Sequence, residues 1–416
     1  MSKCIPFLAL LLLVVLAASG CFIRNLFGPS RADRIEAAKG AVGDLQAGLF
    51  DEAGQRAAEV ADKDDANPQA RLVMAICRYR KAVHEIAADL RSIVVGVVGA
   101  GGINHRYMRF SQEQFDAALA KVDDDLAVAA ADHQVFLELC PACWRIDWNQ
   151  SGRIEDGDEH LFEVEVDADG NPIPDGDPRR RPSFRFDAGD VWWARAMVAF
   201  QRAVVNLGLA YRWTELNMLS GRGLPKSLAD IGITIRLDDR ARVLKARDLV
   251  IAGLDHADRA RREYLAEADD DREWLPNPRQ KDHPLPLPVD DKLYRTWEEV
   301  LADLRALVAG EEGIDLAEAA RLGKRGHEDP AQGYLAVGRL FAEPGDIVVN
   351  LGHLLALEKH RTRADTERVL RDVFGDKYVK EMKPSPILKH LERMKKEIDR
   401  GEESLERKLR YLFWLN

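Results

Sequence analysis

The chain has 416 residues, of which 46% are hydrophobic and 31% are charged, and its formal net charge is −10. This composition excludes a disordered polypeptide, and the length predicts one large or two medium-sized domains. The acidic balance argues against nucleic acid as a partner, because no basic patch recurs along the chain. The densest basic cluster, Arg179-Arg180-Arg181, adjoins an acidic run, and we interpret it as a local charge match.

The beginning of the chain has the layout of a secretory signal peptide. Lys3 precedes an apolar run from Ile5 to Ala18, and the small residues Ser19 and Gly20 stand directly before Cys21. The apolar run is shorter than the roughly 20 residues that a membrane-spanning helix requires. Small residues followed at once by a cysteine resemble the lipobox of bacterial lipoproteins.

This resemblance implies that residues 1–20 are removed and that Cys21 is lipidated with diacylglycerol and a further acyl chain of the palmitate type. Two or more acyl chains give stable anchoring. Phe22, rather than Asp, follows the cysteine, which by the family's sorting rule favours the outer membrane. Residues 21–31 would form a tether, leaving a body that faces the periplasm or the cell surface. An uncleaved signal anchor and an ordinary secreted protein are the alternatives.

Residues 32–138 form a predicted N-terminal helical region. Apolar residues recur at spacings of three and four from Ala32 to Leu90, and again from Gln112 to Glu138. Gly48–Ala53, followed by Asn67-Pro68, resembles a tetratricopeptide helix pair, in which proline ends the second helix. No second copy follows at a period of about 34 residues, so a generic antiparallel helix pair is an equally open interpretation.

Residues 139–189 form a predicted insert that begins with Cys140-Pro141-Ala142-Cys143. This spacing occurs in thioredoxin-type redox motifs, but those follow a strand, and the segment before Cys140 has a helical pattern. A disulfide between Cys140 and Cys143, or a pair of inert thiols, is the favoured interpretation. A redox-active pair remains open, as does a metal site with Cys77 and His133.

The acidic segment Asp147–Asp158 carries oxygen-bearing side chains at alternating positions. Gly152 occupies the sixth position, where a sharp turn favours glycine, and Ile154 is the hydrophobic residue at the eighth. This spacing resembles the twelve-residue calcium loop of the EF-hand family.

The resemblance implies one calcium ion with six protein ligands, of which Arg153 would offer its backbone carbonyl. At position twelve, Asp158 replaces the family's bidentate glutamate, and the segment after the loop has a strand pattern. We therefore predict a weak, structural calcium site with a dissociation constant of about 10⁻⁴–10⁻³ M. A solvated acidic loop is the alternative. The candidate ligands are Asp147, Asn149, Ser151, Arg153, Glu155 and Asp158.

Alternating apolar residues predict a small β-hairpin further along the insert. Phe162, Val164 and Val166 alternate with acidic residues, and Phe184 and Phe186 alternate again after a long acidic loop.

The C-terminal region, residues 190–416, is predicted to be helical. Asp190 is a good N-cap for a largely apolar helix from Val191 to Asn217, which belongs in a core. A Pro-rich loop, Asp269–Pro288, is long enough to be a wall or lid. Further helices are expected over Leu237–Ala266, Tyr294–Val308, Leu316–Leu322, Ala331–Phe341 and Ile347–Lys359, and from Pro386 onward. The apolar stripe of this last helix either packs on the body, which is the favoured interpretation, or meets a partner helix.

Together these patterns predict a mainly α protein: a helical bundle or tetratricopeptide-like array with a small β-hairpin insertion. The favoured function is a lipid-anchored, non-catalytic binding or scaffold module of the cell envelope, with other envelope proteins as partners. The alternative is a periplasmic thiol-redox or hydrolytic enzyme, although no Gly-x-Ser-x-Gly or His-Glu-x-x-His motif occurs. The aromatic residues near Trp192 and Trp213 fit a core better than a ligand cleft.

Overall fold

The computed structural model describes residues 29–98, 105–139, 145–146, 159–160, 163–167, 171–214, 232–283, 289–316, 318–319, 333–350 and 376–399. The protein is mainly helical with small antiparallel strand pairs, which confirms the predicted fold class. Within these ranges, no helix combines the length and the apolar character that a membrane span requires.

The N-terminal region consists of α2 (Arg31–Gln46), α3 (Phe50–Ala61), α4 (Pro68–Val98) and α5 (His105–Ala129). The side chain of Asn67 accepts a hydrogen bond from Ala70 N at 3.0 Å and so caps the start of α4. Pro68 therefore begins a helix, and the expectation that it ends one was wrong. Proline is well suited to the first helical position because the missing N–H would have no partner there.

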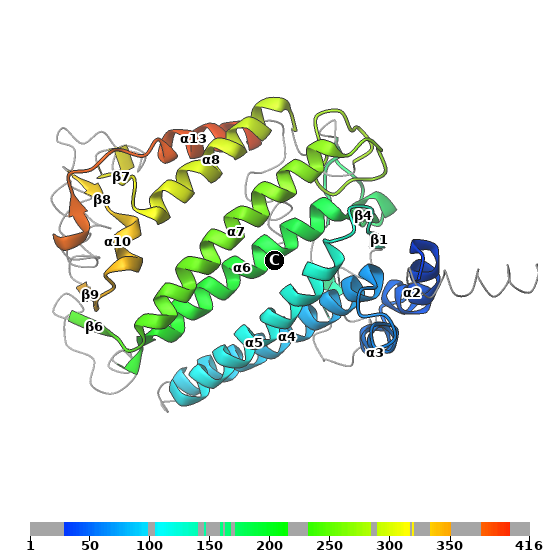
Figure 1. The fold of residues 1–416 in the computed structure, drawn as a ribbon, viewed down its shortest axis with the longest axis horizontal. Coiled ribbons are helices and arrows are strands. Elements are labelled where there is room, and N and C mark those ends of the chain that lie inside the picture. The colour runs from blue at the N-terminus through cyan, green and yellow to red at the C-terminus, as the bar shows by residue number, and fades with distance from the viewer. Residues whose placement is uncertain are drawn as a thin grey trace, which may run out of the picture.

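The long helices lie side by side in chain order across the molecule (Figure 1). Contacts connect α4 with α5, α5 with α6 (Ala188–Ala210), and α6 with α7 (Arg240–Ala266). They continue from α7 to α8 (Asp291–Ala309) and from α8 to α13 (Ile387–Ile398). The predictions for α7, α8 and the start of the C-terminal helix are confirmed to within a few residues.

The start of α6 differs from the prediction by one helical turn. Asp187 is the N-cap and accepts a hydrogen bond from Gly189 N at 2.9 Å. Asp190 completes the capping box by accepting from Asp187 N at 3.3 Å. Two aspartates three residues apart form this reciprocal arrangement, so the second alone was wrongly taken as the cap. The helix ends at Ala210 rather than at Asn217, because Tyr211–Arg212 form strand β5.

The predicted hairpin partner was also wrong. Strand β4 (Phe184–Asp187) exists, but it pairs antiparallel with β1 (Phe136–Leu139), with Phe136 opposite Asp187. Residues 136–138 had been assigned to a helix that in fact ends at Ala129. Alternation identifies a strand but not the partner with which it pairs.

Two three-stranded sheets lie in the C-terminal half. In one, β6 (Gly232–Leu237) lies between β5 and β9 (Ile347–Asn350), and β9 replaces the start of a predicted helix. In the other, β8 (Tyr334–Leu335) lies between β7 (Ile314–Asp315) and β10 (Val379–Lys380). The remaining short elements are α10 (Val337–Ala342), η2 (Pro178–Arg180), η5 (Asp376–Tyr378), β2 (Arg145–Ile146) and β3 (Glu159–His160).

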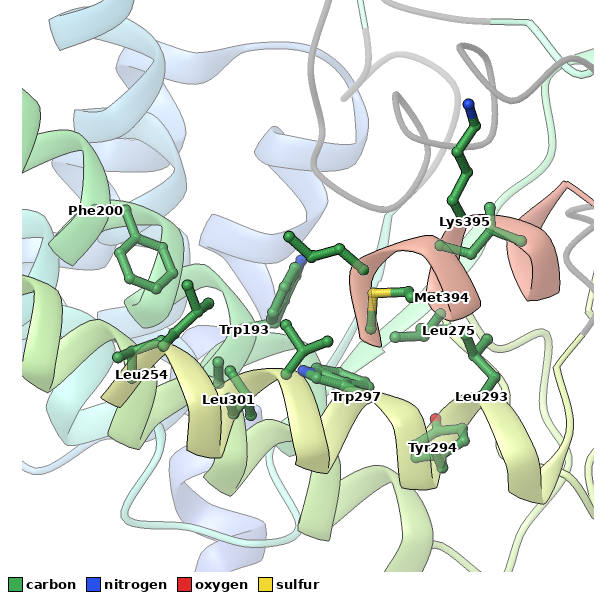
Figure 2. Close-up of a pocket in the computed structure, with 15 residues that line it drawn as sticks. Trp193, Phe200, Leu254, Leu275, Leu293, Tyr294, Trp297, Leu301, Met394 and Lys395 are labelled. Carbon is green, nitrogen blue, oxygen red and sulfur yellow. The ribbon is translucent and has the colours of Figure 1, made fainter. Parts of the chain in front are cut away.

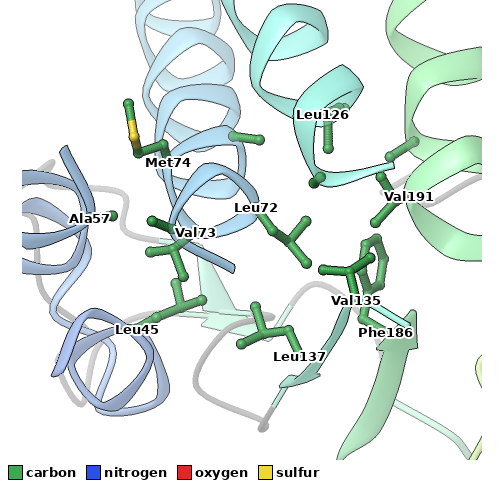
Figure 3. Packing of buried hydrophobic residues seen from close by; sticks show 14 of the residues in the cluster. Leu45, Ala57, Leu72, Val73, Met74, Leu126, Val135, Leu137, Phe186 and Val191 are labelled. Atoms are coloured by element: carbon green, nitrogen blue, oxygen red, sulfur yellow. The ribbon is translucent and has the colours of Figure 1, made fainter. Parts of the chain in front are cut away.

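Two main clusters of buried apolar residues hold the layers together. The first joins α2–α5 to β1, β4 and the start of α6, with Leu72, Leu137 and Val191 at its centre (Figure 3). The second lies between α6, α7 and α8 and includes Trp193, Leu254 and Trp274. The candidate site is built around this second cluster.

Candidate functional site

The site residues predicted from the sequence lie outside the described residues. These are the lipidation residue Cys21, the pair Cys140 and Cys143, and the calcium-loop candidates from Asp147 to Asp158. Strands β2 and β3 flank the loop and pair antiparallel, with Arg145 opposite His160. The loop segment therefore connects two strands rather than two helices, which is a further departure from the EF-hand frame.

The structure also describes Cys77, His133 and the arginine run, which the sequence analysis considered. Cys77 is a free, half-buried thiol, and burial raises its pKa to about 12. His133 Nδ1 lies 3.2 Å from Glu263 Oε1. In the part of the chain that the structure describes, neither belongs to a group that could hold a metal ion. The arginine run from 179 to 181 is paired with nearby acidic residues, as expected.

A cluster of four acidic residues lies where α6 begins and α7 ends. Asp187, Asp190 and Glu273 are buried, and Glu267 is half-buried. Asp187, Glu267 and Glu273 each offer a carboxylate oxygen, and these oxygens lie within 4.8 Å of one another. We call these four residues the carboxyl cluster.

Local structure positions each member of the carboxyl cluster. The capping box of α6 fixes Asp187 and Asp190, and Glu267 follows the last residue of α7. Arg272 adopts a positive φ of 52°, and its carbonyl accepts a hydrogen bond from Arg185 N, which attaches the loop carrying Glu273 to strand β4. This loop belongs to the segment that the sequence suggested as a wall or lid.

Gly189 allows α6 and α7 to approach closely at the carboxyl cluster. A Cβ atom at this position would lie 2.5 Å from the ring of Tyr264 and 3.0 Å from Glu267 Oε1. Any larger residue would therefore push the two helices apart.

The charges of the carboxyl cluster are poorly compensated. Arg185 acts on Asp187 and Glu273, but its guanidinium group pairs with Asp269 at 3.0 Å and with Asp271 at 2.5 Å. Burial, reinforced by the neighbouring carboxylates, raises the pKa of Glu267 to about 11 and that of Glu273 to about 8. The same causes raise the pKa of Asp190 well above its ordinary value. Near neutral pH, the cluster must therefore hold protons or a cation.

Hydrogen bonds reach only some of the carboxyl oxygens in the carboxyl cluster. Tyr264 Oη donates to Asp190 Oδ1 at 2.7 Å, and Gln280 Nε2 donates to Glu267 Oε2 at 3.3 Å. Among the described residues, Glu267 Oε1 is enclosed and receives no hydrogen bond from an N–H or hydroxyl group, and the carboxyl groups of Glu267 and Asp187 face each other closely enough to share a proton. Carboxylate oxygens around one centre suit a hard divalent cation such as Ca²⁺, Mg²⁺ or Mn²⁺. Asp187, Glu267 and Glu273 are the residues that could hold it.

An apolar cavity of about 430 Å³ lies beside the carboxyl cluster, between α6, α7, α8 and α13. Figure 2 shows side chains from these helices converging on it. Its lining is almost entirely carbon and consists of Trp193, Phe200, Leu254, Ala257, Leu275, Leu293, Tyr294, Trp297, Val300, Leu301, Leu304, Leu391, Met394, Lys395 and Ile398.

Aromatic rings form the wall between the cavity and the carboxyl cluster. Trp297 packs edge-on against Trp193, with ring centroids 5.4 Å apart, and lies 5.6 Å from Tyr294. Its ring centroid also lies 6.4 Å from that of Tyr264, which hydrogen-bonds to the carboxyl cluster. Trp193, which the sequence assigned to a core, is buried and also lines the cavity.

Helix α13 closes one side of the cavity and is attached to α8 by polar contacts. His390 Nδ1 lies 2.7 Å from Asp303 Oδ2, and Arg393 Nη1 donates to Glu299 Oε2 at 2.6 Å. Ile398 is buried, whereas Leu391 is 43% exposed. The predicted packing of this helix on the body is confirmed for its described residues.

Sequence reasoning missed both parts of this site. Asp190 was singled out only as a helix cap, and nothing marked Asp187, Glu267 or Glu273, because they are far apart in the chain. No protein-family model, curated protein or solved structure matches this chain. We therefore infer the function from the cavity and the carboxyl cluster.

Proposed function

We propose that this protein is a non-catalytic binding protein of the bacterial envelope that holds an apolar small molecule in the cavity between α6, α7, α8 and α13. The carbon-lined cavity of about 430 Å³ carries this proposal. Small-molecule sites are typically concave, mostly apolar spaces of roughly 300–1,000 Å³. Removing apolar ligand surface from water would provide the binding free energy.

The polar groups at the cavity support binding rather than catalysis. Tyr294 Oη donates to the carbonyl of Pro276 at 3.1 Å, so its hydroxyl is engaged in holding the wall. The carboxyl cluster lies behind the aromatic rings rather than among the lining residues. An apolar ligand would therefore meet hydrocarbon and aromatic surfaces.

The lipobox-like sequence around Cys21 supports an envelope location. A lipid anchor in the outer membrane would keep the cavity close to apolar molecules of the envelope, and other envelope proteins would deliver or receive them. Intact mass measurement of protein from membranes should give a chain that begins at Cys21 and carries diacylglycerol and an acyl chain. An unmodified chain with residues 1–20 intact would contradict the anchor.

Binding of a divalent cation is the second candidate function. Glu267 Oε1 favours it, because an enclosed carboxylate oxygen without a hydrogen-bond donor is costly unless a proton or cation meets it. The calcium loop at Asp147–Asp158 remains a separate proposal. Both sites would be structural, and the variants Glu267→Gln and Asp147→Ala separate their contributions.

Filling the cavity tests the proposed function. Dodecanol should raise the melting temperature of the wild-type protein, because a ligand that binds only the folded state stabilises it. Ala257→Phe, deep in the cavity, and Met394→Trp, on α13, should abolish this rise. Circular dichroism verifies that each variant is folded, and Val204→Ala, on the 68% exposed position of α6, is the control. No rise in the wild type, or equal rises in folded variants with a filled cavity, would contradict the proposal.

A further inference from the structure

We infer that the ligand is a single-chain amphiphile with an anionic head group, such as a long-chain carboxylate, whose head meets Lys395. This inference depends on the proposed function, because it names the class of molecule that the same cavity takes. The shape of the cavity and the positive charge at one end of it support this class of ligand.

The cavity is elongated along α8. The residues of α8 that line it run from Leu293 to Leu304, which corresponds to about 16 Å at roughly 1.5 Å per residue. Phe200 and Leu254 lie at one end, and Leu293 and Lys395 lie towards the other (Figure 2). A space of about 430 Å³ spread over this length accommodates one extended alkyl chain better than two chains or a wide fused-ring system.

Lys395 places a cation at one end of the apolar space. Its aliphatic stem belongs to the lining, and its ammonium group points away from the apolar side chains (Figure 2). An amphiphile can use both parts, because its chain packs against the stem while its head group remains with the charge in water.

The neighbouring cations are already paired. Arg393 meets Glu299 at 2.6 Å, Lys396 meets Glu392 at 2.9 Å, and Lys292 meets Glu397. Lys395 has no ion pair with any residue in the described ranges. Among the described residues, therefore, no carboxylate would have to leave Lys395 before an anionic head group could reach it.

Head-group charge should thus separate molecules with the same chain. Dodecanol would bury the same hydrocarbon but offer no charge to Lys395, and dodecyltrimethylammonium would meet a like charge. A solvent-exposed ion pair corresponds to a preference of up to about five-fold for dodecanoate over dodecanol. This preference should decrease with added salt, because exposed charges are screened.

Calorimetric titration of the full chain with these three compounds, below their micelle-forming concentrations, tests the inference. Lys395→Gln should weaken dodecanoate binding by up to about five-fold, to the affinity of dodecanol, and leave dodecanol binding unchanged. Lys389 is the matched control, because it is an exposed lysine of the same helix outside the cavity lining. Lys389→Gln should change neither affinity.

The failures of the two proposals are distinguishable. If dodecanol and dodecanoate bind the wild type equally, or if Lys395→Gln leaves dodecanoate binding unchanged, the head-group inference is overturned and the cavity function stands. Tightest binding by dodecyltrimethylammonium would likewise overturn the head-group inference and leave the cavity function standing. If none of the three compounds binds, both proposals are overturned.

Discussion

Tyr264 donates a hydrogen bond from Oη to Asp190 Oδ1 at 2.7 Å, and both residues are almost completely buried. This bond joins the last turn of α7 to the first turn of α6. The ring of Tyr264 also lies against Trp297, which lines the cavity. The carboxyl cluster and the apolar cavity therefore share one aromatic wall, and a change on one side should be detectable on the other.

Tyr264→Phe should destabilise the protein by about 1–3 kcal/mol, because it leaves a buried carboxyl oxygen of Asp190 without its donor. Urea unfolding at neutral pH measures this loss. Tyr107→Phe is the control, because Tyr107 is 37% exposed and its hydroxyl donates to Asp89 at the surface, where water can replace it. Equal stabilities of the two variants would show that the Tyr264 bond contributes nothing specific.

Stability should fall as pH rises from about 5 to about 8. Burial raises the pKa of Glu273 from 4.5 to about 8, so the folded protein keeps a proton that the unfolded chain has already released. The stabilisation is complete below pH 4.5 and is lost as pH rises through the folded value. This single group contributes a slope of about 1.4 kcal/mol per pH unit within that window.

Glu273→Gln should remove this contribution and flatten the dependence of unfolding free energy on pH. Glu36→Gln is the control, because Glu36 is exposed and its side chain has 73% of its surface accessible. Urea unfolding at several pH values between 5 and 8 compares the slopes. Parallel curves for the wild type and Glu273→Gln would contradict the buried, protonated state of Glu273.

A divalent cation should compete with protons for the carboxyl cluster. Millimolar Ca²⁺ or Mn²⁺ should therefore raise the melting temperature more at pH 8 than at pH 6, because metal binding requires deprotonated ligands. Glu267→Gln should remove the component from the carboxyl cluster, and Asp147→Ala should remove any component from the calcium loop. Identical melting curves with cation and with chelator at both pH values would exclude both sites.

Gly189→Ala should destabilise the protein by about 1–3 kcal/mol, because the added Cβ would collide with Tyr264 at 2.5 Å. Gly43→Ala is a matched substitution in an exposed part of α2, where nothing lies within 4 Å of the added atom. It should stabilise the protein by about 0.5–1 kcal/mol through helix propensity. Denaturant unfolding measures both changes in the free energy of unfolding. If the two substitutions changed it in the same direction, the close packing of α6 against α7 would be contradicted.

Local patterns in the sequence were sufficient to predict most helices. They were insufficient to predict which elements pack or pair with one another. The apolar periodicity of residues 294–308 identified α8, whose N-cap, Asp290, accepts a hydrogen bond from Leu293 N at 2.8 Å. The alternation at Phe184 and Phe186 identified β4, but its partner β1 lies about fifty residues earlier and has too short an alternating run to be recognised.

The carboxyl cluster shows why the site could not be predicted. Asp187 and Glu267 are eighty residues apart, and only the packing of α6 against α7 brings them together. Each residue alone resembles an ordinary acidic residue at a helix end. The cavity is equally non-local, since its lining comes from four helices whose apolar faces have the periodicity of any core helix.

Fluorescence quenching by dodecanoate that carries a bromine on its chain tests the cavity most directly, because Trp193 and Trp297 line it. If the ligand occupies the cavity, quenching in the wild type should be strong and saturable. Quenching should be largely lost in the Trp193→Phe/Trp297→Phe double variant, while calorimetry shows that the variant still binds the ligand. Equal quenching of the wild type and the double variant would place the ligand elsewhere and contradict the proposed function.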